Sequence, residues 1–203
     1  ATDSQFNVFV GYQAGLTNNS ADGNTAIGYL AMSTASTAAN SVAIGRQAMT
    51  GGTVTGDFNV AIGRTCASAL TSGTQNQTIG VDSLASATDG SYNVAIGGSA
   101  LREGNPSYAV AVGNQSGRKL AAIGTHVGYE SGRNTTSGSN TMVGYRTGYS
   151  NVGGTANVFI GHDTAYYNTS GDYNVAIGNA ASQANQTGDR NVHIGQEAGE
   201  FNT

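Results

Sequence analysis

Few side chains in this sequence have the chemistry of a catalytic or metal site. The histidines are His126, His162 and His193, and the single cysteine is Cys66. No serine, histidine and carboxylate stand out as a nucleophilic triad, and a lone cysteine excludes a disulfide within the chain. The sequence therefore predicts that the protein is not an enzyme and binds no cofactor.

Acidic side chains recur in one kind of turn. Asp57, Asp172 and Asp189 each follow a glycine and stand two residues before an asparagine. Such carboxylates could bind calcium, but the Gly-Gly-x-Gly-x-Asp nonapeptide of calcium-binding solenoids is missing. We interpret these residues as solvated turn acids and predict no metal site.

Tyrosines supply the remaining binding chemistry. The chain has ten, and Tyr149, Tyr166 and Tyr167 lie in segments that vary between the repeats described below. Exposed aromatic rings in such segments could stack on glycans. We predict these three tyrosines as candidates for receptor binding.

Charge and hydropathy exclude two classes of partner. The net charge is −4, with 8 basic and 12 acidic residues, so the chain lacks the basic excess of a protein that follows nucleic-acid phosphates. No apolar run approaches the roughly 18 residues of a membrane-spanning helix. With 31 glycines and few large aliphatic residues, a conventional globular core is hard to build, so a repeat architecture is favoured.

A motif close to Asn-Val-Ala-Ile-Gly recurs along nearly the whole chain. Successive motif glycines are 17 residues apart in most cases. This period is too short for a pair of helices with their loops, and β-branched residues occupy the fixed positions, which favours strands. The motif glycines are Gly11, Gly28, Gly45, Gly63, Gly80, Gly97, Gly113, Gly124, Gly144, Gly161, Gly178 and Gly195.

We therefore predict an all-β fold, a parallel β-solenoid of about twelve 17-residue coils, each with two short strands and two turns. Coils ~4.8 Å apart would give a rod roughly 57 Å long. The spacing falls to 11 and then rises to 20 around Gly124. Within one solenoid over residues 1–203, we expect regular coils at 1–102 and 125–203 and an irregular coil or kink at 103–124.

Alternation along each strand assigns the motif residues to two faces. The Val or Ile before each glycine shares a face with the residue two positions earlier, and we expect this face to fill the coil. The predicted core residues are Val10, Ile27, Ile44, Ile62, Ile79, Ile96, Val112, Ile123, Val143, Ile160, Ile177 and Ile194. The aromatic residues expected by the same alternation to cap the core edge are Phe6, Phe58, Tyr92, Tyr108 and Tyr173.

The opposite face of the strand carries small or apolar residues and no charge, which is unusual for a face in water. We predict that it packs against other chains about a three-fold axis, as a homotrimer. The alternative is a small polar face exposed to solvent. The predicted inter-chain packing residues are Phe9, Ala26, Ala43, Ala61, Ala95, Met142, Phe159, Ala176 and His193.

The repeat also sets expectations for individual residues. Three copies of His193 could converge on the axis and bind a metal or an anion, although a neutral, hydrogen-bonded histidine is the simpler interpretation. His126 and His162 adjoin motif glycines and are expected on turns or exposed edges.

Cys66 takes a position otherwise held by small residues and is expected in the core. Tyr29 follows a motif glycine, as do Tyr12 and Tyr145, which predicts a column that is either a stabilising ladder or a sugar-binding stripe.

The motif resembles the repeats of two known families. Residues 40–45, NSVAIG, resemble the signature of the left-handed parallel β-roll heads of trimeric autotransporter adhesins. Residues 7–15 and 24–29 are similar to repeats in phage tail fibres, and the coil is longer than that of the adhesin heads. The resemblance implies a left-handed β-roll, a trimer, and an extracellular location on a virion tail fibre or a cell surface.

Residues 44–49, IGRQAM, also resemble the hexapeptide repeat of left-handed β-helix acyltransferases, but the hexapeptide occurs once per coil rather than three times. The sequence thus predicts a non-enzymatic trimeric fibre segment, from a phage tail fibre or an adhesin head, that projects and mediates attachment to a host or cell surface. Its partners would be two further copies and a surface glycan or protein receptor, without nucleic acid or membrane insertion. The alternatives are a purely structural fibre shaft, a monomeric ice-binding-type solenoid and a hexapeptide-repeat acyltransferase.

Overall fold

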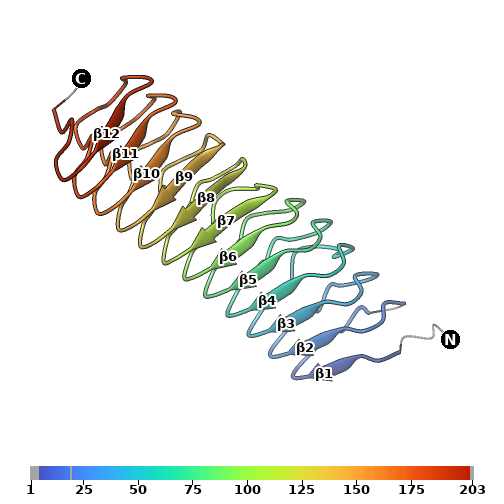
Figure 1. The fold of residues 1–203 in the computed structure, drawn as a ribbon. Helices are drawn as coiled ribbons and strands as arrows, with labels where there is room; N and C mark the ends of the chain where they lie inside the picture. The colour runs from blue at the N-terminus through green and yellow to red at the C-terminus, as the bar shows by residue number, and fades with distance from the viewer. Residues whose placement is uncertain (1–4, 19, 202–203) are drawn as a thin grey trace.

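Each repeat of the sequence forms one coil, and the coils stack into a parallel β-solenoid of about 11 turns (Figure 1). The computed structural model describes residues 5–18 and 20–201. The prediction of an all-β solenoid with coils of roughly 17 residues is confirmed. Within the described ranges, no helix is long and apolar enough to cross a membrane.

Each coil contributes one short strand, and the twelve strands pair in chain order as one parallel sheet. In place of the second strand predicted for each coil, the described residues form turns and irregular backbone, with one isolated parallel bridge between Ala35 and Val54. The strands are β1 (Val8–Val10), β2 (Thr25–Ile27), β3 (Val42–Ile44), β4 (Val60–Ile62), β5 (Gln77–Ile79), β6 (Val94–Ile96), β7 (Ala109–Val112), β8 (Gly124–Val127), β9 (Asn140–Val143), β10 (Val158–Ile160), β11 (Val175–Ile177) and β12 (Val192–Ile194).

The two faces of the strands are the reverse of the prediction. The middle residue of each motif points into the coil and the flanking Val and Ile point outward, so the sheet has its small residues inside. The residues predicted for the core but found half-buried or exposed are Val10, Ile27, Ile44, Ile62, Ile79, Ile96, Val112, Ile123, Val143, Ile160, Ile177 and Ile194. The residues predicted for inter-chain packing but found facing the coil interior are Phe9, Ala26, Ala43, Ala61, Ala95, Met142, Phe159, Ala176 and His193.

Limited space inside the coil explains the reversal. The side chain six positions after the middle residue lies in the same interior. Where one of these two side chains is large, the other is small. A Cβ on Gly15 would lie 2.7 Å from the ring of Phe9, whereas the small Ala95 is combined with Leu101 in one buried cluster. Because interiors are packed to a nearly constant density, a coil that holds Met or Leu in the turn leaves room only for a small residue in the strand, which is Ala or, opposite Leu84, Thr78.

Motif glycines are required because the coils approach one another closely at that point. Gly63 has φ 137°, and a Cβ there would lie 2.4 Å from the carbonyl oxygen of Gly80 in the next coil. Only glycine combines this backbone conformation with such a close approach. The repeated glycine is therefore a stacking requirement of the solenoid.

The asparagine that begins most motifs joins neighbouring coils through a buried ladder. Asn59 donates its side-chain N–H groups to the carbonyl oxygens of Gly56 and Gly73, at 3.0 and 2.8 Å. Its Oδ1 accepts the backbone N–H of Asn76 at 3.0 Å. These bonds satisfy polar groups that the stacking removes from water.

The segment at 103–124, predicted to be irregular, continues the sheet without interruption. Gly124 lies inside strand β8, so the motif glycine of this coil is Gly128. Gly97, Gly113, Gly128 and Gly144 are therefore 16, 15 and 16 residues apart. The coils here are slightly short, and alanine and glycine replace the ladder asparagine at the start of β7 and β8.

Candidate functional site

The turns that follow β8, β9 and β10 carry a cluster of aromatic and charged side chains. In each turn, the residues one, two and five positions after the motif glycine are of these types, and stacking of the coils aligns them in columns. Tyr167 adjoins them. We call this set the Tyr–Arg surface; it comprises Tyr129, Glu130, Arg133, Tyr145, Arg146, Tyr149, His162, Asp163, Tyr166 and Tyr167.

Rings in this surface stack along the solenoid. Tyr129 lies on Tyr145 with ring centroids 5.2 Å apart, and Tyr145 lies on His162 at 4.9 Å. Tyr149 stacks on Tyr166 at 5.0 Å. The coil rise of ~4.8 Å matches a stacking distance, so equivalent aromatic positions meet face to face. The faces of these rings are therefore in stacking contact with one another.

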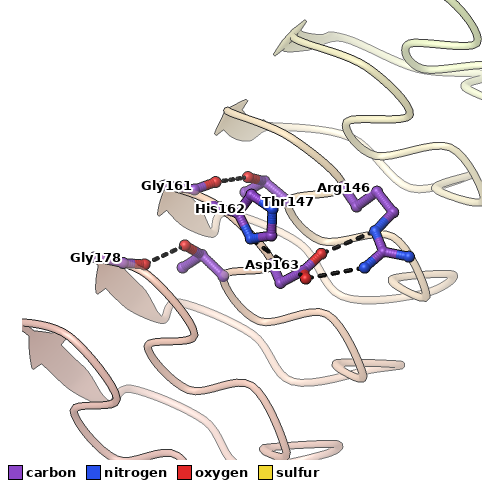
Figure 2. A network of polar contacts seen from close by, with 7 residues as sticks. Arg146, Thr147, Gly161, His162, Asp163 and Gly178 are labelled. Atoms are coloured by element: carbon purple, nitrogen blue, oxygen red, sulfur yellow. Dashed lines mark hydrogen bonds and ion pairs between the residues drawn. The ribbon is translucent and has the colours of Figure 1, made fainter.

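Arg146 lies at the centre of the surface. Its Nε and Nη2 each donate to a carboxylate oxygen of Asp163 at 2.9 Å (Figure 2). The guanidinium carbon also lies 5.1 and 5.0 Å from the ring centroids of Tyr145 and Tyr166. His162 places Nδ1 3.3 Å from the same carboxylate (Figure 2). The hydrogen bonds that Arg146 donates to Asp163 raise the pKa of Arg146 above its ordinary value, so this cation is permanent.

Threonines beneath the surface fix the turns that present it. Thr147 donates its hydroxyl to the carbonyl oxygen of Gly161 in the next coil (Figure 2). Thr164 donates to that of Gly178 at 2.5 Å. Both threonines are fully buried. The aromatic and charged side chains are thus mounted on backbone that the neighbouring coil holds in place.

Arg133 forms a second paired group. Its Nε donates to Gln115 Oε1 at 2.7 Å and its Nη1 to the hydroxyl oxygen of Tyr149 at 2.6 Å. The Nε also lies 3.5 Å from a carboxylate oxygen of Glu130. The two arginines of the Tyr–Arg surface are therefore balanced by two carboxylates, and the surface is nearly neutral.

The three tyrosines predicted to bind a receptor lie together. Tyr149 and Tyr166 are half-buried and stacked, and partial burial raises the pKa of the Tyr166 phenol. Tyr167 meets Tyr166 edge-on, with interplanar angle 78°, and is 51% exposed. Of the three, Tyr167 is the side chain most open to a ligand; receptor binding stays a prediction.

The histidines divide into three environments. His162 lies on an exposed turn, as predicted. His126 does not: it is the fully buried middle residue of β8, neither ring nitrogen has a hydrogen-bond partner, and burial lowers its pKa to about 4. The predicted convergence of His193 on an axis at the outer face is also wrong, since its ring points into the last coil and Nδ1 meets Ser182 Oγ at 2.5 Å.

Cys66 and the turn acids make contacts that indicate a structural role. Cys66 is fully buried, as predicted, with Sγ 3.0 Å from Thr78 Oγ1, and burial raises its pKa to about 11. Asp172 accepts the backbone N–H of Thr155 at 2.6 Å, and Asp189 accepts that of Asp172 at 2.8 Å. Across the part of the chain that the structure describes, no three His, Cys, Asp or Glu side chains group to hold a metal ion.

The outward side of the sheet is a second candidate surface. We call its two columns of strand residues the Val/Ile face; it comprises Val8, Val10, Thr25, Ile27, Val42, Ile44, Val60, Ile62, Gln77, Ile79, Val94, Ile96, Val110, Val112, Thr125, Val127, Thr141, Val143, Val158, Ile160, Val175, Ile177, Val192 and Ile194. Five aromatic residues precede the strands and are exposed instead of capping the core. They are Phe6, Phe58, Tyr92, Tyr108 and Tyr173.

Sequence reasoning predicted the tyrosines but missed Arg133, Arg146 and the outward Val/Ile face. Aligning the repeats on the motif glycines, with Gly128 in place of Gly124, would have placed Arg133 in the column of Tyr149 and Tyr166 and Arg146 in a charged column with Glu130 and Asp163. The geometry offers two surfaces suited to contact with a partner. Comparisons of the chain with protein-family models, with curated proteins and with solved structures gave no match.

Proposed function

We propose that this chain is a non-enzymatic segment of an extracellular fibre that assembles as a homotrimer through the Val/Ile face. The observation that carries the proposal is the continuity of this face. In its second column every strand, from Val10 to Ile194, presents Val or Ile, and the outward positions of the described strands bear no charge. A monomeric soluble protein rarely exposes so long an apolar stripe.

The size of the Val/Ile face supports a stable association. Twelve strands spaced ~4.8 Å apart and three to four residues wide give a footprint on the order of 700 Å². A standard protein interface takes roughly 800 Å² from each partner. The face of one chain is therefore comparable in size to the surface that a standard complex takes from each partner.

Because the Val/Ile face repeats from coil to coil, further copies of the same chain are its favoured partners. A partner that contacts every coil needs side chains at the same spacing, and another copy has this spacing by construction. Three copies about one axis close the association without leaving a face open. The resemblance of the motif to trimeric fibre repeats supports three copies rather than two.

Changing Ile96 to Lys is expected to abolish the trimer without unfolding the coil. Ile96 is 38% exposed in the single chain, so a lysine there reaches water, whereas a trimer would desolvate three ammonium groups. Analytical ultracentrifugation should give three times 20.4 kDa for the unaltered chain and a monomer for Ile96→Lys, with matching circular dichroism.

The control for this experiment is Gln186→Lys, which adds the same charge on an exposed turn and should stay trimeric. An unaltered chain that sediments as a monomer would contradict the proposal. A free-standing solenoid would then need tests of thermal hysteresis and of acyl-CoA turnover.

Attachment to a host or cell surface is the second part of the proposal, and the Tyr–Arg surface is its candidate site. The surface lies on turns beyond the ends of the strands, so the trimer leaves it in contact with solvent. Repetition in three chains would multiply weak contacts into firm attachment. The ligand would be a surface glycan or a protein receptor.

Replacing Tyr167 with Ala is expected to weaken attachment about tenfold, because one exposed aromatic contact is removed. Binding of the trimer to whole cells and to a glycan array measures the effect. Leu16→Ala, which removes an exposed apolar side chain from a turn of the first coil, is the control. Equal binding by Tyr167→Ala and the unaltered trimer would remove the Tyr–Arg surface as the site.

A structural shaft without binding of its own is the second candidate function. The observation in its favour is that the rings and charges of the Tyr–Arg surface are largely engaged with one another, as Arg146 is with Asp163. If this segment binds neither cells nor glycans while a longer chain that contains it does, the shaft function is the correct one.

A further inference from the structure

Gln77 is the one amide among the outward residues of the twelve described strands. Its neighbours in the same column are Val60 and Val94, which pair with it in register on either side. Gln77 is exposed in the single chain, and a shallow hollow beside it is lined by Phe58, Gln75 and Gln77 itself. A polar, recessed spot thus interrupts an otherwise aliphatic stretch of the Val/Ile face.

A repetitive interface has a register problem that this spot can solve. Because every coil looks nearly alike, chains in a trimer could associate level or displaced by one coil, and a one-coil displacement forfeits contact only at the ends. We propose that Gln77 fixes the level register of the three chains. This inference rests on the proposed trimer and adds to it the residue that determines how the copies align.

The physical reason is the difference between a paired and an unpaired buried amide. In the level arrangement, the three Gln77 side chains lie at one height and can donate and accept among themselves, with the hollow beside them giving room. A one-coil displacement sets Gln77 against Val60 or Val94 of another chain, where its amide finds no partner. Single polar residues in apolar interfaces select register in this way at some expense of stability.

Threonines in the same column are also polar, but they select the register of the chains less strongly than Gln77 does. Thr25, Thr125 and Thr141 also interrupt the aliphatic residues, but a hydroxyl can bond to backbone carbonyl groups within its own chain. Thr125 and Thr141 are direct neighbours, so a one-coil displacement still brings one threonine opposite another. Gln77 has no such neighbour and discriminates more strongly.

Pulsed dipolar spectroscopy between spin labels measures the register. One set of chains carries a label at Thr53→Cys and another at Gly153→Cys, exposed turn positions that are six coils, or about 29 Å, apart along the rod. Cys66 is buried and escapes labelling. Trimers refolded from a mixture should show one inter-chain distance between the two labels.

In the Gln77→Val background, the level population should fall at least twofold, with new distances that fit an axial displacement of one coil rise, ~4.8 Å. The melting temperature of this trimer should equal or exceed that of the unaltered one. Gln186→Val is the matched control and should keep a single distance. A single distance in Gln77→Val would overturn the register inference alone, whereas the absence of any inter-chain distance in the unaltered chain would overturn the trimer as well.

Discussion

Replacing Gly63 with alanine is expected to destabilise the solenoid by about 3–5 kcal/mol, the combined magnitude of backbone strain and overpacking. The backbone at Gly63 has φ 137°, where an L-residue is strained. The added Cβ would also lie 2.4 Å from the carbonyl oxygen of Gly80. Neither group can withdraw easily, because Gly80 donates its own N–H to Ile62 at 2.8 Å and is held in the next coil.

Urea unfolding followed by circular dichroism tests this expectation. Coils interact mainly with their neighbours, so a break at Gly63 should lower the midpoint or split the transition into two. Gly153→Ala is the matched control, because its Cβ would lie 3.9 Å from the nearest atom, the carbonyl oxygen of Thr169. The control should change stability by less than about 0.5 kcal/mol. If Gly63→Ala unfolds together with the unaltered chain, close stacking at the glycine column is not what stabilises the rod.

The fold class could be predicted because the constraint that sets it is visible in the sequence. Parallel coils stack only when their lengths match, and this requirement leaves a period near 17 between motif glycines. The same constraint identifies the motif glycine of the coil near residue 124. Both Gly124 and Gly128 follow an aliphatic residue, but only Gly128 keeps the spacing nearly constant at 15 and 16.

The direction of the two strand faces could not be derived from alternation alone. Alternation places Val60 and Ile62 on one side and Ala61 on the other, but it does not say which side is inside. The general expectation that larger aliphatic residues are buried gave the wrong answer, because the interior of a coil is narrow. The deciding signal was the size compensation six residues apart, as in Phe9 with Gly15.

The candidate surfaces were predictable only in part for the same reason. Tyr149 and Tyr166 could be identified as aromatic residues in variable segments, and their stacking follows from their equal offsets from motif glycines. The position of Arg146 between the rings of Tyr145 and Tyr166 depends on side chains from two neighbouring coils. The register of β8 matters instead for Arg133, because the assignment of Gly124 as a motif glycine obscured its offset of five residues from Gly128.

His126 is expected to make the solenoid sensitive to acid. Its imidazole is fully buried and faces Ala111 and Met142 of the adjoining strands, with no charged group contributing to its shifted titration. Burial lowers its pKa from 6.5 to about 4, so protonation favours the unfolded chain. The stabilising contribution is complete above pH 6.5 and is lost as the pH falls from 6.5 towards 4, by about 3 kcal/mol in total.

Replacing His126 with methionine should remove this part of the acid sensitivity. Met142 occupies the equivalent position of the next coil beside Gly148, and His126 lies beside Gly132 in the same way, so the coil can accept methionine. Free energies of unfolding at pH 7 and pH 4.5 should differ less in His126→Met than in the unaltered chain, by about 2–3 kcal/mol. Carboxylates contribute equally to both proteins, so the difference isolates the imidazole. His162→Gln, at an exposed position, should retain the full dependence, and an unchanged pH dependence in His126→Met would show that the buried imidazole does not control acid stability.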